Sequence, residues 1–268
     1  MIDKVSKRKY LERIQNKDEK FFVASVLDKA SKFERENSFE ITGFMDLNEL
    51  KLAREALGHF NISYIVKGVN DELDKKNILF IPDYLEGIED SVYADNVVCI
   101  KIIPESKDKL AHRDFMGAIY NLSVEREYLG DIIVKDSIAY FFTMKSFEKY
   151  FIENIVYVGK SPVETKVIDI YSQEIESLSQ NYKEKDYIVP SMRVDAILSE
   201  VYALSRSQTK DKIEKGHLFI NDKEQYFPST PLECGDIVSF RQCGKFKVGE
   251  QVRTTKSGNI VLHIKQYA

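Results

Sequence analysis

The feature that most constrains the fold is the order of the apolar patterns after residue 96. β-Branched runs and alternating stretches predict strands, whereas apolar residues at helical spacing predict helices. The predicted elements are a strand over 97–103, a helix over 110–122, strands over 132–134 and 138–142, a helix over 146–155 and a strand over 163–170. This β-α-β-β-α-β order leaves few ways of folding this part of the chain.

The same order describes the split β-α-β arrangement of ferredoxin-like domains, which RRM modules share. An RRM binds RNA through aromatic side chains in a glycine-containing motif on its third strand. Tyr140, Phe141 and Phe142 supply aromatic residues at that strand, but the glycines are missing. Two interpretations stay open: packing of these rings in the core, which the missing glycines favour, and stacking on RNA bases.

The first sixty residues are expected to be helical. Phe22, Val26 and Ala30 repeat at helical spacing, and Asp46 with Glu49 forms the signature of a capped helix start. The polar stretch over 172–189 is typical of a linker. We therefore predict an α+β protein with a helical N-terminal domain over 1–60, an RRM-like domain over 61–171, a linker over 172–189 and a small α+β domain over 190–268.

Charge is unevenly distributed along the 268 residues. The whole chain carries 39 basic and 43 acidic residues, a net charge of −4 that by itself argues against a nucleic-acid partner. From Pro190 onward, however, 12 basic residues face nine acidic ones, a net charge of +3. Since the preceding part carries −7, the sequence indicates a basic module attached to an acidic body.

Two helices are predicted at the start of that basic module. The second runs from about Arg206 to Lys215, with Ser205 as N-cap and Gly216 as the stop signal. A helix N-terminus exposes free N–H groups and partial positive charge, so it is a ready site for phosphate. The residues expected to surround such a phosphate are Ser205, Arg206 and Ser207, with Arg193 from the first helix. Gln208, Lys212 and Lys215 repeat at helical spacing and predict a polar, cationic ridge.

The motif order in this module resembles the S-four, or alpha-L, RNA-binding domain. The resemblance is carried by Arg193-Val194-Asp195, Leu204-Ser205-Arg206-Ser207-Gln208, Ile213-Glu214-Lys215-Gly216, Ile220-Asn221-Asp222-Lys223, Cys234-Gly235-Asp236 and Gly244-Lys245-Phe246. It implies that the helices lie on the backbone of structured rRNA or tRNA. The RNA-contacting positions that it implies are Arg193, Ser205, Arg206, Ser207, Gln208, Lys212 and Lys245.

Over nearly its full length the chain is similar to the YlmH family of bacterial RNA-binding proteins. The body motifs behind this resemblance are His112-Arg113-Asp114-Phe115-Met116-Gly117-Ala118, Gly130-Asp131-Ile132-Ile133-Val134 and Val158-Gly159. The resemblance implies a non-enzymatic factor that binds rRNA and tRNA on the large ribosomal subunit. The process that the resemblance implies is ribosome-associated quality control of stalled nascent chains. In this process the factor holds tRNA while a C-terminal tail is added to the nascent chain. The expected molecule is a cytoplasmic monomer without membrane contacts, with other quality-control factors as further partners.

No catalytic, cofactor or metal site is predicted. Cys99, Cys234 and Cys243 lack ligand spacing, and their odd number at wide separations is typical of a reducing compartment. The His112-Arg113-Asp114 run lacks the other motifs of a kinase, so Arg113 and Asp114 are expected to open a helix instead. Two alternatives remain open: an RNA-modifying enzyme such as a pseudouridine synthase, and a protein-docking adaptor.

Overall fold

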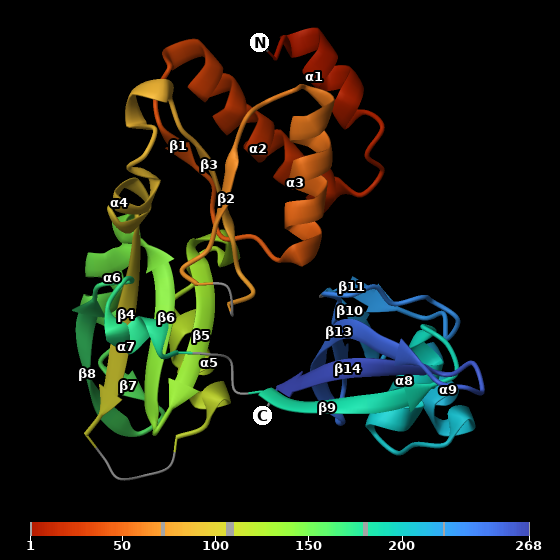
Figure 1. Cartoon of the computed structure of the whole chain (residues 1–268). Coiled ribbons are helices and arrows are strands. Elements are labelled where there is room, and N and C mark those ends of the chain that lie inside the picture. Colours follow the sequence, from red (N-terminus) through yellow and green to blue (C-terminus); the bar gives the residue numbers. More distant parts are fainter. Residues whose placement is uncertain (1, 71–72, 106–109, 179–181, 222, 268) are drawn as a thin grey trace. The chain divides into compact units, whose positions relative to one another are not determined.

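The computed structural model describes residues 2–70, 73–105, 110–178, 182–221 and 223–267. The chain divides into two compact units, Met1–Ser179 and Gln180–Ala268, and each contains both helices and sheet (Figure 1). The α+β class predicted from the sequence is therefore confirmed. Within the described residues, no helix combines the length and the apolar character that crossing a bilayer requires.

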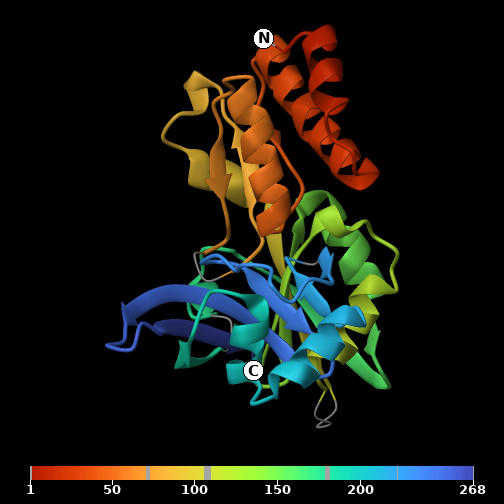
Figure 2. The same cartoon turned by 90° about the vertical axis from the view of Figure 1, so that its right-hand side faces the viewer.

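Unit 1 opens with three helices beside a small antiparallel sheet (Figure 2). Asp46 accepts a hydrogen bond from Glu49 N (2.8 Å) and Glu49 accepts one from Asp46 N (2.9 Å), which confirms the predicted capped helix start. The sheet has the strand order β1-β3-β2. The elements are α1 (Lys4–Leu11), α2 (Lys17–Glu36), β1 (Glu40–Ile41), α3 (Leu47–His59), β2 (Ile65–Lys67) and β3 (Asn77–Phe80).

The second part of unit 1 has the predicted β-α-β-β-α-β order. Its antiparallel sheet has the strand order β5-β6-β4-β8-β7, in which β4, β5, β6 and β8 reproduce the ferredoxin-like arrangement. Short helices η1 (Asp83–Leu85) and α4 (Glu89–Ala94) lead into it. The elements are β4 (Val97–Pro104), α5 (His112–Tyr120), η2 (Arg126–Tyr128), β5 (Leu129–Lys135), β6 (Ile138–Met144), η3 (Lys145–Phe147), α6 (Glu148–Asn154), β7 (Tyr157–Val158) and β8 (Ser161–Ile168).

The side chains of strand β6 are buried on both faces of this sheet. Phe141 packs with α5 and α6 on one face, while Tyr140 and Phe142 join a second core cluster on the other. All three side chains are at most 6% exposed. Of the two interpretations of these aromatic residues, core packing is confirmed, because rings covered in this way cannot stack on RNA bases.

The predicted boundary at residue 60 is wrong. Strand β3 pairs with β1 across that boundary, and Phe80 packs in one cluster with Leu27 of α2 and Leu57 of α3. A further cluster joins Phe44 and Leu79 to the RRM-like sheet. The N-terminal helices therefore do not form a helical domain of their own, because their apolar faces are covered by strands that come later in the chain.

The predicted linker over 172–189 contains two structured elements. Helix α7 (Gln173–Glu176) is capped by Ser172 and buries Ile175 against the RRM-like sheet. Strand β9 (Tyr182–Val189) begins unit 2 by pairing along its whole length with β14. The polar composition of this segment misled the prediction, because an edge strand and a one-turn helix expose most of their side chains.

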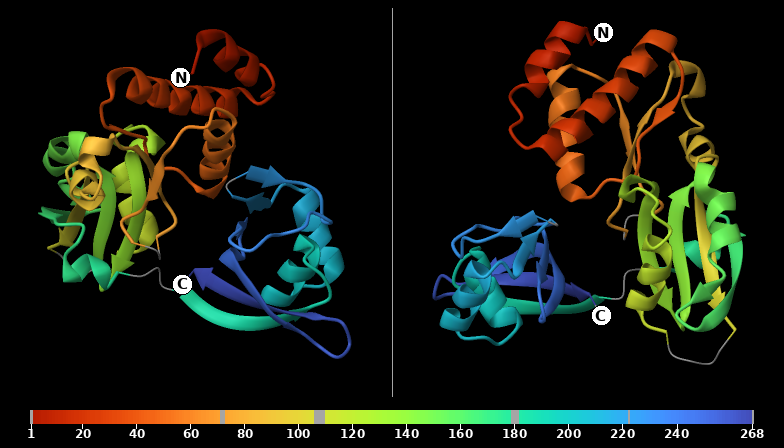
Figure 3. Two further views of the ribbon diagram at one scale, coloured as in Figure 1. Left: turned by 45° about the horizontal axis from the view of Figure 1, so that its top comes forward. Right: turned by 180° about the vertical axis from the view of Figure 1, so that it is seen from behind.

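Unit 2 is a six-stranded antiparallel sheet with the strand order β11-β10-β12-β13-β14-β9 and two helices against one face (Figure 3). Val194, Ile197 and Ile213 of the helices pack on Val238 and Phe246 of the strands. The two helices predicted for this module are confirmed. The elements after β9 are α8 (Val194–Val201), α9 (Arg206–Glu214), β10 (Leu218–Ile220), β11 (Lys223–Gln225), β12 (Ile237–Phe240), β13 (Gly244–Thr254) and β14 (Ile260–Tyr267).

Burial of the β6 aromatic residues generates a first prediction. Phe142→Ala should lower the free energy of unfolding by about 3–5 kcal/mol, because it leaves a cavity in the core between the sheet and the segments that cover it. Phe21→Ala is the matched control, since Phe21 is 80% exposed and its loss should change stability by no more than about 0.5 kcal/mol. Urea unfolding followed by circular dichroism measures both values. Equal stability of the two variants would contradict the core assignment.

Candidate nucleic-acid interface

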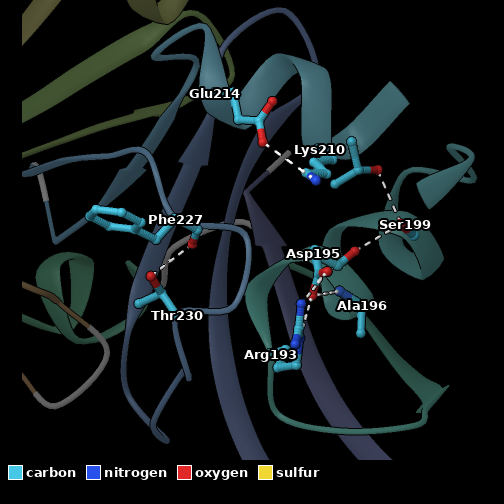
Figure 4. Close-up of polar contacts among 9 residues, drawn as sticks. Arg193, Asp195, Ala196, Ser199, Lys210, Glu214, Phe227 and Thr230 are labelled. Atoms are coloured by element: carbon cyan, nitrogen blue, oxygen red, sulfur yellow. Dashed lines mark hydrogen bonds and ion pairs between the residues drawn. The ribbon is translucent and has the colours of Figure 1, made fainter. Parts of the chain in front are cut away.

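The N-terminus of α8 is held by the loop that joins β11 to β12. Val194 N donates to Thr230 O (2.9 Å) and Asp195 N donates to Pro228 O (3.2 Å). The loop is braced in turn by the Thr230 hydroxyl, which donates to Phe227 O at 2.8 Å (Figure 4). The first N–H groups of α8 are therefore used within the protein, and this helix start contributes its side chains rather than its backbone to any ligand.

Arg193 is fixed by a two-pronged ion pair with Asp195 (Figure 4). Its Nε and Nη2 atoms donate to the two Asp195 carboxylate oxygens at 3.0 and 2.8 Å, and Ala196 N donates to the same carboxylate at 2.9 Å. Burial by itself would raise the pKa of Asp195. Hydrogen bonds from Arg193 and Ala196, together with the positive charges of Arg193 and Arg206, instead hold that pKa below its usual value.

The two helices are joined by a buried hydroxyl pair. Ser199 Oγ donates to Asp195 O within α8 (2.8 Å) and lies 3.0 Å from Thr209 Oγ1 of α9. Both side chains are nearly inaccessible to solvent. Because this contact sets the helices against each other, the charge of Arg206 at the start of α9 acts on the same carboxylate that holds Arg193. The structure thus brings together the two predicted arginines.

The start of α9 is a complete capping box. Ser205 Oγ accepts from Gln208 N (3.2 Å), and Gln208 Oε1 accepts from Ser205 N (3.0 Å). Gln208 therefore turns back toward its own helix start instead of extending the predicted ridge. Among the described residues, the backbone N–H groups of Arg206 and Ser207 have no hydrogen-bond partner, so they remain available to an anion.

The two ridge lysines have different surroundings. Lys215 Nζ donates to Asp211 at 2.7 Å, which partly neutralises its charge. Lys212 Nζ lies 3.4 Å from Gln242 Oε1 in the turn between β12 and β13, and it lies over the ring of Phe240. Of the two, Lys212 has no acidic partner within the described part of the chain and is the stronger candidate for a phosphate contact.

Lys245 lies on the other face of the sheet. Along β13, Phe246 and Val248 point into the core under α8 and α9, so Lys245 and Lys247 must point to the opposite side. Lys245 Nζ accordingly lies 4.7 Å from the centre of the Tyr267 ring on β14. The predicted RNA-contacting residues therefore do not form one surface. Lys247 and Lys265 lie on the same face as Lys245, as the alternation in both strands indicates.

The described part of the chain contains no group of three His, Cys, Asp or Glu side chains that could hold a metal ion. Cys99 is buried, and its burial raises the pKa of its thiol.

Arg113 and Asp114 open α5 as predicted, because the Asp114 carboxylate accepts from Ala111 N at 2.8 Å.

Comparisons with known proteins match most of the chain. Residues 94–172 match the family model described as the putative RNA-binding domain in YlmH. Ribosome-associated protein quality control protein P2 from Bacillus subtilis (strain 168) is 22% identical over 237 residues, which are 85% of this chain and 88% of that protein. The predicted resemblance to the YlmH family is confirmed.

A solved structure is also similar. Cell division protein ylmH from Streptococcus pneumoniae is 21% identical, covers 58% of this chain and 93% of its own, and superimposes with a TM-score of 0.48. The S-four assignment of unit 2 stays a prediction, because the matched family model ends before unit 2 begins.

The capping box at the start of α9 generates a second prediction. Ser205→Ala removes the side chain that satisfies Gln208 N and should lower the free energy of unfolding of unit 2 by about 1 kcal/mol. Ser229→Ala is the matched control, because Ser229 is an exposed serine of unit 2 outside this capping box, so its loss should change stability by no more than about 0.5 kcal/mol. Thermal and urea unfolding measure both. Equal destabilisation by the two substitutions would contradict the capping role of Ser205.

Proposed function

We propose that this chain is a non-enzymatic RNA-binding factor of ribosome-associated quality control. It binds rRNA and tRNA on the large ribosomal subunit and stabilises tRNA while a C-terminal tail is added to a stalled nascent chain. Unit 2, as an S-four-type domain, supplies the contact to the RNA backbone through α8 and α9.

The observation that carries this proposal is the match, over 85% of the chain, to a relative whose name places it in ribosome-associated quality control. The match of residues 94–172 to a putative RNA-binding domain supports the same class of ligand. Both comparisons agree with the resemblance to the YlmH family, from which the same process was predicted. The tRNA contact and the large subunit rest on the family resemblance.

The chemistry of the α8–α9 surface supports a phosphate ligand. Two free backbone N–H groups at the start of α9, the exposed Arg206 guanidinium and the half-exposed Arg193 side chain lie on one part of unit 2. Helix dipole and guanidinium charge both favour an anion at this point. Charge-assisted hydrogen bonds of this kind contribute about 1.5–3 kcal/mol each.

A modest positive charge determines how such a surface binds. Asp195 partly neutralises Arg193, and Asp211 partly neutralises Lys215. A surface with so little free charge binds non-specific RNA weakly, and its affinity depends on a matching arrangement of phosphates. A folded rRNA or tRNA provides such an arrangement, which favours structured RNA as the ligand of this surface.

Removal of both arginines provides the third prediction. Arg193→Ala combined with Arg206→Ala should reduce co-sedimentation with large ribosomal subunits about tenfold or more, because two charge-assisted phosphate contacts are lost. Arg8→Ala combined with Lys9→Ala is the control, since it removes the same charge from exposed positions on α1. Arg206→Ala alone should also weaken binding, and it disturbs no ion pair among the described residues. Melting temperatures of all variants show whether they remain folded.

Salt dependence tests the electrostatic mechanism separately. If about five phosphates are neutralised, the logarithm of the affinity should fall with the logarithm of the salt concentration at a slope of roughly −3 to −4. The double arginine variant should show a shallower slope than the α1 control. Unchanged co-sedimentation of the arginine variant, or a flat salt response of the unmodified protein, would contradict the proposed contact surface.

A further inference from the structure

The face of the unit 2 sheet that points away from α8 and α9, which we call the outer face, carries a row of side chains that crosses all six strands. Cross-strand pairing places Glu224 opposite Phe219, Phe219 opposite Ser239, Ser239 opposite Lys245, and Tyr267 opposite Tyr182. The cation–π contact between Lys245 and Tyr267 closes the gap in this series. Because neighbouring strands lie about 4.8 Å apart, the row is about 24 Å long.

Three aromatic rings in this row each lie beneath a cation. Arg241 lies 4.7 Å from the centre of the Phe219 ring, Lys245 lies 4.7 Å from that of Tyr267, and Lys265 lies 5.5 Å from that of Tyr182. The rings of Tyr182 and Tyr267 also contact each other edge to face, with centres 5.0 Å apart. The outer face therefore alternates positive charge with flat apolar surface, which is the composition of sheets that bind single-stranded nucleic acid.

Positive charge is concentrated at the centre of the outer face. Lys247 of β13 lies directly opposite Lys265 of β14, and Lys245 follows Lys247 on the same side of β13. Three lysines thus lie on two neighbouring strands of this face, where a polyanion would meet them together.

Acidic groups of the outer face lie toward its two edges. On β9, Glu184 accepts from Lys265 (3.3 Å), and Asp186 lies 2.8 Å from His263. At the opposite edge Glu224 lies on β11. The lysines of β13 and β14 therefore lie between acidic groups at the two edges, and they make the middle of this face its most basic part.

We propose that the outer face of the unit 2 sheet is a second RNA-binding surface, separate from the α8–α9 surface, and that it takes an unpaired RNA segment. Lys245, Lys247 and Lys265 contact the phosphates. When Lys245 and Arg241 move from the rings of Tyr267 and Phe219 to phosphates, those rings become stacking surfaces for bases. An acidic peptide would also be attracted by the lysines, but it would make no use of the aligned rings. A paired RNA presents no free base faces, so it fits this surface poorly.

This inference extends the proposed function, because it assumes that unit 2 binds RNA, but it assigns the unpaired segment to a different face of the sheet. The α8–α9 surface offers helix N–H groups and guanidinium groups to a folded backbone. The outer face instead offers a flat strip across six strands. Substitutions on the two faces should therefore separate binding of unpaired RNA from binding of the ribosomal subunit.

The test uses the full-length protein and a fluorescently labelled oligouridylate of about ten nucleotides. Lys245→Gln combined with Lys265→Gln keeps a polar, unbranched side chain at both positions but removes the charge. It should weaken binding about tenfold and make the logarithmic salt slope shallower by about 1.4, since each phosphate contact to a single strand contributes about 0.7. Lys183→Gln combined with Lys185→Gln is the matched control, because these exposed lysines lie on the opposite side of β9 and should leave binding unchanged.

A stacking variant separates the rings from the charges. Tyr267→Leu keeps an apolar side chain but removes the aromatic surface, so it should weaken oligouridylate binding at least about fivefold and leave the salt slope unchanged. Lys245→Arg combined with Lys265→Arg keeps both charges, so this variant should bind oligouridylate as the unmodified protein does, unlike the Gln variant. Melting temperatures close to that of the unmodified protein show that each variant is folded.

Three results would overturn the inference. The Lys245/Lys265 variant could bind oligouridylate as the unmodified protein does, the Lys183/Lys185 control could lose as much affinity, or polyglutamate could displace the oligouridylate as well as unlabelled RNA does. If subunit co-sedimentation still depends on Arg193 and Arg206, these results refute only RNA binding by the outer face and leave the proposed function standing. A protein that binds neither the subunit nor the oligouridylate refutes the proposed function as well.

Discussion

Side-chain alternation across the six-stranded sheet of unit 2 is the constraint on which the rest of that unit depends. Val238, Phe246 and Leu262 lie on one face of the sheet and have to be covered, and α8 with α9 provides the cover. Covering this face places the starts of both helices, with Arg193 and Arg206, at the protein surface. The opposite face then has to carry the intervening side chains of the same strands, which include Lys245. Two surfaces of different chemistry follow from a single pleated sheet.

The same constraint has a different result in the RRM-like sheet of unit 1. Phe141 is covered by α5 and α6, and Phe142 is covered by the segments before β4 and after β8. On that second face Glu174 of α7 accepts from the Tyr140 hydroxyl and from Lys101, both at 2.6 Å, so a polar contact closes the sheet where an RRM would bind bases. An RNA contact by residues 94–172 therefore has to use the edges, helices or loops of this domain.

Local signals in the sequence predicted much of the fold. The element order over 97–170, the capped start of α3 at Asp46 and the capped start of α9 at Ser205 were all predicted, because each depends on residues within a few positions of one another. The linker prediction over 172–189 was wrong because β9 is specified by its partner β14, about 80 residues further along the chain. Lys245 and Arg206 were both predicted to contact RNA, and the structure places Lys245 on the side of the sheet that faces away from the helices, which helical spacing cannot indicate for a strand residue.

The sequence by itself determined where helices begin, which residues cap them and which side chains carry charge, because these properties depend on the identities of neighbouring residues. Only the tertiary structure decided which charges share a surface. The Ser199–Thr209 contact sets α8 against α9 so that Arg193 and Arg206 act on one carboxylate, and strand pairing places Lys247 opposite Lys265. Both arrangements arise from contacts between distant parts of the chain, whose register is chosen by the burial of the core and not by any local pattern.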